Sequence, residues 1–174
     1  MKSLTGVCLL ACLLVFRLDA WRTKIDVTER FLAVLPAAIE PEGFAMRNVR
    51  IGILDALIPD RCGVTTIGIT DETARKIEEE GPKFFESITQ SRSNLTQGRG
   101  PVVFSNWRKT PVTSAGSIGE SMIMAVFSCA GRSGIPSRKI IEGLESGNAY
   151  ISGKGYSQHY VLPGQKLFVH AFID

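Results

Sequence analysis

Ser117 lies in the sequence pattern that is best suited to catalysis. It stands between Ala115 and Gly119 in the run AGSIG, and small residues two positions either side of a serine permit the sharp strand-to-helix turn of a nucleophile elbow. The surroundings argue against this chemistry, because residues 109–114 make a poor buried strand and residues 121–129 favour a strand where the elbow requires a helix. A glycine-containing connector between two strands is the alternative interpretation.

A hydrolase built on Ser117 would need an acid and then a histidine further along the chain. The residues that follow in this order are Glu142 or Glu145 and then His159 or His170. Five-residue patterns this loose occur often by chance, and no other complete catalytic set is present. We therefore expect a protein that is not an enzyme, with a small secreted serine hydrolase as the alternative.

Cys129 and Arg132 resemble the thiolate and the arginine that bracket phosphate in cysteine-dependent phosphatases. That phosphate loop places five residues between the two groups, so that successive backbone N–H groups can curl around the anion. Here only two residues separate them. The chain between Cys129 and Arg132 is too short to form the phosphate-binding loop, and a turn after a strand is the simpler interpretation.

The two histidines, His159 and His170, are the only imidazoles of the chain. If Leu162 lies opposite Gln165 in a terminal hairpin, the two are diagonal neighbours on one face, about 7–8 Å apart at the backbone. No acid on either strand completes a metal site before Asp174. The alternative to a metal site is two half-exposed histidines that pack beside Phe168 and Phe172. We expect no metal and no cofactor.

Positive charge is concentrated in the middle of the chain. The net charge of +3 is too small to predict nucleic-acid binding, but residues 87–141 hold seven bases and one acid, Glu120. The residues that we expect to bind a partner are Arg92, Arg99, Trp107, Arg108 and Lys109. The predicted partner is a protein, or an anionic glycan or lipid surface, and the alternative is that these charges are scattered over the surface.

The first twenty residues have the pattern of a secretory signal. A basic start precedes the eleven-residue apolar run 6–16, which ends at Arg17 and is too short to cross a bilayer. Cleavage after Ala20 would leave residues 21–174 as a single small domain, secreted or periplasmic and without a transmembrane anchor. Two alternatives are a lipoprotein signal ending at Cys12 and an apolar first helix that stays in the fold.

Export would leave two cysteines, Cys62 and Cys129, in the mature chain. In an oxidising compartment an even pair is expected to form a disulfide. The bridge would close a loop of 129 − 62 = 67 residues and would contribute about 4 kcal/mol on the chain-entropy model. Two separate buried thiols are the alternative.

The elements that must position these residues follow from periodicity, caps and turn residues. A loop at 91–100, which carries Asn94 in a glycosylation triplet, separates two groups of elements. The predicted helices are a segment at 27–35 stopped by Pro36, one that begins after Thr70 and ends at Gly81, a short one from Pro82, and one from Pro136 to Gly147. The predicted strands cover residues 49–58, 64–69, 102–107, 121–129, 149–152, 156–162 and 166–173.

This order predicts an α+β domain with a mostly antiparallel sheet of six or seven strands and three or four short helices. With 44% hydrophobic residues the chain can bury an ordinary core. In the terminal hairpin, the better core face collects Tyr160, Leu162, Leu167, Val169, Ala171 and Ile173. The predicted function is an exported binding or accessory domain that acts on a macromolecular partner. An immunity or inhibitor protein is a further alternative.

Overall fold

The computed structural model describes residues 32–42, 62–92, 102–104, 106–111, 137–154 and 157–173. The expected signal at 1–20, the expected strands at 49–58 and 121–129, and the loop at 93–100 lie outside the described residues. Within the described ranges no helix is both long and apolar enough to cross a membrane.

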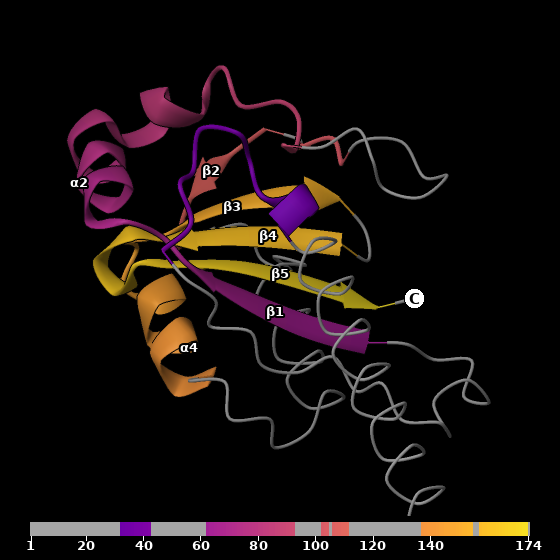
Figure 1. The fold of residues 1–174 in the computed structure, drawn as a ribbon. Coiled ribbons are helices and arrows are strands. Elements are labelled where there is room, and N and C mark those ends of the chain that lie inside the picture. The colour runs from indigo at the N-terminus through magenta and orange to yellow at the C-terminus, as the bar shows by residue number, and fades with distance from the viewer. Residues whose placement is uncertain are drawn as a thin grey trace, which may run out of the picture.

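The described part of the chain folds around one antiparallel sheet of five strands in the order β1-β5-β4-β3-β2 (Figure 1). The strands are β1 (Cys62–Gly68), β2 (Arg108–Lys109), β3 (Tyr150–Lys154), β4 (Ser157–Leu162) and β5 (Leu167–Ile173). A single antiparallel sheet with a few helices is the α+β class expected from the sequence. Four of the five described strands correspond to predicted ones, and the fifth, β2, was not predicted. Of the other predicted strands, those at 49–58 and 121–129 lie outside the described residues, and the one at 102–107 does not form.

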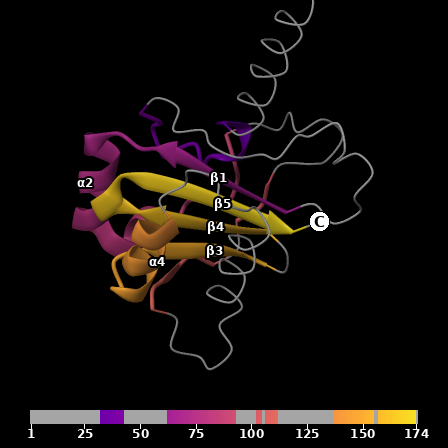
Figure 2. The ribbon, with the colours of Figure 1, turned by 90° about the horizontal axis from the view of Figure 1, so that it is seen from below.

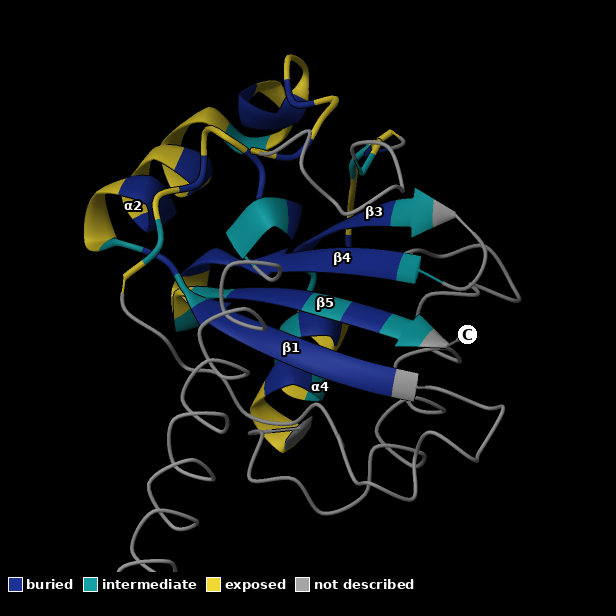
Figure 3. Cartoon of the chain, turned by 45° about the vertical axis from the view of Figure 1, so that its right-hand side comes forward, coloured by how far each residue is buried: buried dark blue, intermediate teal, exposed yellow. Residues whose placement is uncertain are grey.

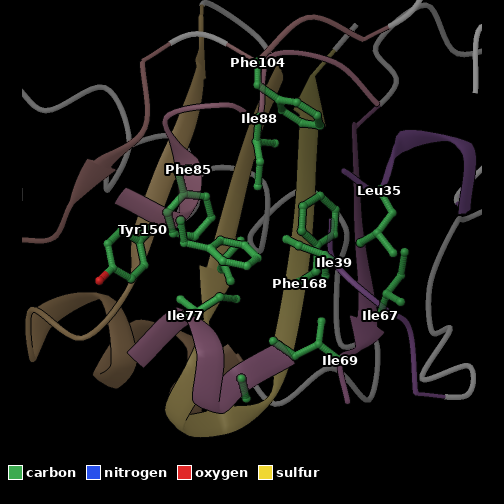
Figure 4. Packing of buried hydrophobic residues seen from close by; sticks show 13 residues of the cluster. Leu35, Ile39, Ile67, Ile69, Ile77, Phe85, Ile88, Phe104, Tyr150 and Phe168 are labelled. Atoms are coloured by element: carbon green, nitrogen blue, oxygen red, sulfur yellow. The ribbon is translucent and has the colours of Figure 1, made fainter. Parts of the chain in front are cut away.

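Both faces of this sheet are covered by helices (Figure 2, Figure 3). The helix α4 (Ser137–Glu145) packs Ile140 and Leu144 onto one face. On the other face lie α2 (Asp71–Glu80) and the 3-10 helix η2 (Gly81–Phe85). The second face also buries Leu35, Ile39 and Phe168 (Figure 4). The sequence predicted that one face of the terminal hairpin belongs to the core. In the structure both faces of the hairpin are buried in the core.

The terminal hairpin closes through the 3-10 helix η3 (Pro163–Gln165). Lys166 follows in the left-handed conformation with φ 52°, and its N–H donates to the carbonyl of Pro163 over 2.8 Å. The loop therefore takes up four residues, and Leu162 pairs with Leu167, where the sequence analysis expected Gln165. The error is an even number of residues, so each side chain keeps its predicted face.

The helix α2 begins and ends at the residues that the sequence indicated. The Thr70 side chain accepts a hydrogen bond of 3.2 Å from the backbone N–H of Thr73, and acidic residues occupy the first turn. Gly81 ends the helix with φ 60°, a conformation that favours glycine. The short helix expected from Pro82 is η2, which buries Phe84 and Phe85.

The strand predicted at 102–107 is wrong for the described residues of this segment. The chain here makes only an isolated bridge between Gln90 and Val103, and regular pairing begins at Arg108. Two aromatic side chains explain the difference, because Phe104 and Trp107 both pack against the core under α2 and η2. The segment therefore lies over the sheet and joins its edge only at β2.

Candidate functional site

The two histidines face each other at the centre of the sheet. His159 of β4 pairs directly with His170 of β5, and their rings are stacked with centroids 4.7 Å apart and planes 6° from parallel. The expected diagonal placement is wrong, because the four-residue turn moves the register by two positions. His159 is 2% exposed, so the expectation of half exposure is also wrong for this ring.

Polar side chains extend on both sides of the histidine pair. Thr65 of β1 is the cross-strand partner of His170, and Ser152 of β3 is the partner of His159. Direct partners in an antiparallel sheet share a face. The four residues Thr65, His170, His159 and Ser152 thus form a row across four strands, which we call the histidine row. The histidine row lies on the face that α2 and η2 cover.

Aromatic rings surround the histidine row on the same face. Phe104 meets His159 edge-on, with centroids 4.9 Å apart and an angle of 83°. Phe168 stacks on His159 at 6.0 Å, and Phe172 lies 5.4 Å from His170. The histidines are therefore placed in an apolar environment, in which a neutral ring is more stable than a charged one.

This environment lowers the pKa of both rings. Burial lowers the pKa of His159 well below 6.5, and the neighbouring His170 lowers it further. Hydrogen bonding with the backbone of Ser152 has a smaller, opposing effect. Burial lowers the pKa of His170 to about 4. Both histidines are neutral at pH 7.

Several polar atoms of the histidine row have no hydrogen-bond partner among the described residues. These atoms are Oγ1 of Thr65, both ring nitrogens of His159 and Nδ1 of His170. Each buried donor or acceptor without a hydrogen-bond partner lowers the free energy of unfolding by about 1–3 kcal/mol. The Nε2 atom of His170 is paired, because Oγ of Ser157 lies 3.2 Å away. Thr65, His159 and His170 thus bring together, inside a well-packed face, four polar atoms that have no partner among the described residues.

The contact between Ser157 and His170 has the geometry of a nucleophile beside a base, but its chemistry is unfavourable. A general base works best with a pKa near the operating pH, whereas that of His170 is about 4. No described acid orients the ring, since Nδ1 of His170 has no partner in these ranges. The pair is a poor catalytic dyad.

The residues named for a hydrolase are not brought together in the described structure. Ser117 lies outside the described residues. Glu142 is on α4, which packs on the opposite face of the sheet from His159, and its carboxylate pairs with Arg138 at 2.9 Å. Glu145 is exposed at the end of the same helix.

Stacking also prevents the two histidines from sharing one metal ion. A metal bound to imidazole lies close to the ring plane, about 2.0–2.1 Å from the nitrogen. Two nearly parallel rings that are stacked face to face cannot both hold one ion in their planes. No group of three or more histidines, cysteines or acids suited to a metal occurs within the described ranges.

Two of the predicted binding residues have structural roles. The guanidinium of Arg92 pairs with Glu40 at 3.0 Å and donates to the carbonyl of Ile39 at 2.9 Å. Trp107 is half-buried, and its indole N–H donates to the carbonyl of Ile88 at 3.2 Å. Both side chains hold covering segments in place, so each contributes to the fold whether or not it contacts a partner.

Arg108 and Lys109 are placed differently. Both are exposed and form the whole of β2, which is the edge strand beside β3. Neither makes an ion pair with an acid of the described ranges. Arg99 and Cys129 lie outside the described residues, and of Cys62 only the position at the start of β1 is described, so the predicted disulfide stays a prediction.

Sequence reasoning found the two histidines and their shared face but not the row to which they belong. Thr65 carries no local signal, because its neighbour His170 comes from a strand more than a hundred residues away, whereas Ser152 lies on the strand directly before that of its neighbour His159. Comparison with known proteins adds no assignment: no family model, no curated protein and no solved structure matches the chain.

Proposed function

We propose that this protein is an exported binding domain without catalytic activity, which holds an anionic surface of a macromolecular partner through Arg108 and Lys109. The observation that carries the proposal is the placement of two adjacent cations, exposed and without described acidic partners, on the edge strand β2. Cations placed in this way attract an anionic partner, and added salt weakens this attraction. Export rests on the signal pattern of residues 1–20.

A basic edge strand also has a simpler use, since charged side chains on an edge discourage pairing with other sheets. The two roles respond differently to the sign of the charge. Acidic side chains in place of Arg108 and Lys109 would protect the edge from pairing equally well. They would, however, repel an anionic partner and abolish its binding. The pair of substitutions Arg108→Glu and Lys109→Glu therefore separates them.

The test measures binding to heparin and to vesicles that contain phosphatidylglycerol, at low salt. Each cation near an anionic surface contributes about 1 kcal/mol, so Arg108→Gln with Lys109→Gln should weaken binding about ten-fold or more. The matched control is Arg75→Gln with Lys76→Gln, which removes two exposed charges from α2 and should change binding less than two-fold. Binding that is insensitive to salt would contradict the proposal.

A separate experiment tests the alternative function, a serine hydrolase. Ser117 and Ser157 are the two serines to test, the first for its sequence pattern and the second for its contact with His170. A fluorophosphonate probe should label neither in the folded protein. Labelling that disappears in Ser117→Ala or Ser157→Ala would establish an enzyme in place of a binding domain.

A further inference from the structure

We propose that the stacked pair of His159 and His170 is an acid-sensitive latch, which holds residues 102–104 against the sheet while both rings are neutral and releases them when a ring takes up a proton. The inference is independent of the binding edge on β2. It rests on the stacking of the two rings, on the edge-on contact of Phe104 with His159, and on the pairing of residues 102–104 through an isolated bridge instead of a regular strand.

A proton added to either histidine would be buried beside the other ring and without a described acidic partner. The two ring centroids are 4.7 Å apart, so a charge on one ring makes a second protonation less favourable. A buried charge must be paired or hydrated. Both nitrogens of His159 and Nδ1 of His170 lack partners among the described residues, and a proton on any of them requires water to enter the row.

The groups that face the rings offer no compensating charge within the described ranges. The facing residues are Thr65 on β1, Ser152 on β3, Ser157 on β4, Phe168 and Phe172 on β5, and Phe104. None of these side chains titrates. The only described ionisable group that acts on His159 is His170.

The segment 102–104 is held less firmly than the strands that carry the histidines. Residues 102–104 contact the row through Phe104, which is 4% exposed and meets His159 edge-on, whereas the neighbouring Val103 is 69% exposed. The segment is held by backbone bonds from Ser91 to Val102 and from Phe104 to Thr89, together with the bond from Val102 to the Ser91 hydroxyl. The strands β4 and β5 are joined by six residue pairs. Local opening of the segment is therefore less costly than separation of the strands.

Native-state amide exchange tests the latch in the full chain. The probes are the N–H groups of Phe104 and Val102, compared with those of β5 between pH 7.5 and pH 4.5. After correction for intrinsic exchange rates, uptake of one proton on opening should lower the protection of Phe104 by up to about ten-fold per pH unit. The protection of β5, which reports global unfolding, falls with pH as well, because both histidines take up protons in the unfolded chain, so the latch is identified by Phe104 staying less protected than β5 at each pH.

Trp107 gives a second readout, because its ring lies 5.4 Å from that of Phe104. With Trp21→Phe it is the only tryptophan of the chain, and its emission should change on acidification while far-UV circular dichroism stays constant. His159→Phe and His170→Phe should each reduce this change, because each removes one of the two titrating rings. Ser157→Ala is the matched control, since it removes the hydroxyl beside His170 and leaves both rings, and it should keep the change.

Three results would overturn the latch. The first is protection of Phe104 that does not fall with pH over the whole range. The second is equal protection of Phe104 and β5 at each pH, which would mean that Phe104 opens only by global unfolding. The third is an acid response that persists undiminished in both histidine variants. The exchange comparison requires no variant, so it decides the matter even if His159→Phe and His170→Phe do not fold.

Discussion

The hydroxyl of Tyr160 donates a hydrogen bond of 2.6 Å to Oε1 of Gln158, two residues earlier on β4. Both side chains are buried, on the face of the sheet that α4 covers. Burial raises the pKa of Tyr160, so the hydroxyl stays protonated and remains a donor. This bond satisfies a polar group on an otherwise apolar face.

Replacing Tyr160 with phenylalanine should therefore destabilise the protein. The change leaves the amide oxygen of Gln158 buried without this donor, at a cost of about 1–3 kcal/mol in the free energy of unfolding. Urea denaturation at pH 7.5 measures it. Combining Tyr160→Phe with Gln158→Leu removes both polar partners and should recover part of the loss, whereas full additivity of the two changes would show that the bond contributes nothing.

The N-cap of α2 predicts a second loss of stability. Thr70 accepts from the N–H of Thr73, and its hydroxyl also donates to Oγ1 of Thr73 over 2.9 Å. Thr70→Ala should lower the free energy of unfolding by about 1 kcal/mol. Thr70→Ser keeps the hydroxyl and should lose less. Equal losses for the two variants would assign the effect to the methyl group instead of the cap.

A close approach of α4 to the hairpin predicts a third effect. A methyl group built on Gly143 would lie 2.6 Å from Cδ2 of the buried Leu162. Alanine gains about 1 kcal/mol in helix propensity over glycine, but overpacking costs about 1–3 kcal/mol. Gly143→Ala should thus destabilise the protein or leave it nearly unchanged. Lys139→Ala, at an exposed position on the same helix, is the control, and a clear stabilisation by Gly143→Ala would show that α4 moves freely.

The histidine pair predicts how stability depends on pH. The pKa of His170 is about 4 in the folded protein, against an ordinary value of 6.5. Between these values the unfolded chain binds the proton more tightly, so the free energy of unfolding should be constant above about pH 7 and fall as the pH drops from about 6.5 to about 4. His170 alone accounts for a loss of about 3 kcal/mol across this window.

Urea titrations at pH 7.5, 5.5 and 4.5 measure this loss. His170→Phe removes the titrating group and should flatten the dependence by that amount. His159→Phe should flatten it as well, because burial also lowers the pKa of His159. A profile for His170→Phe that is parallel to that of the unchanged protein would refute the assignment of the loss to this ring.

Local patterns in the sequence determined much of the described fold. Thr70 and Gly81 mark the ends of α2 because a hydroxyl cap and a positive φ are properties of single positions. The alternation of side chains along β4 and β5 assigned residues to the right faces, since a period of two survives a register error of two. The prediction of a strand at 102–107 was wrong because the burial of Phe104 and Trp107 outweighed the strand propensity of this segment.

The histidine row was decided only by tertiary structure. The sequence placed His159 and His170 on one face, but their direct opposition depends on Lys166 adopting a left-handed conformation that lengthens the turn. Thr65 reaches His170 through pairing of β1 with β5, more than a hundred residues apart. Such pairing is set by packing over the whole sheet, so no local pattern in the chain encodes it.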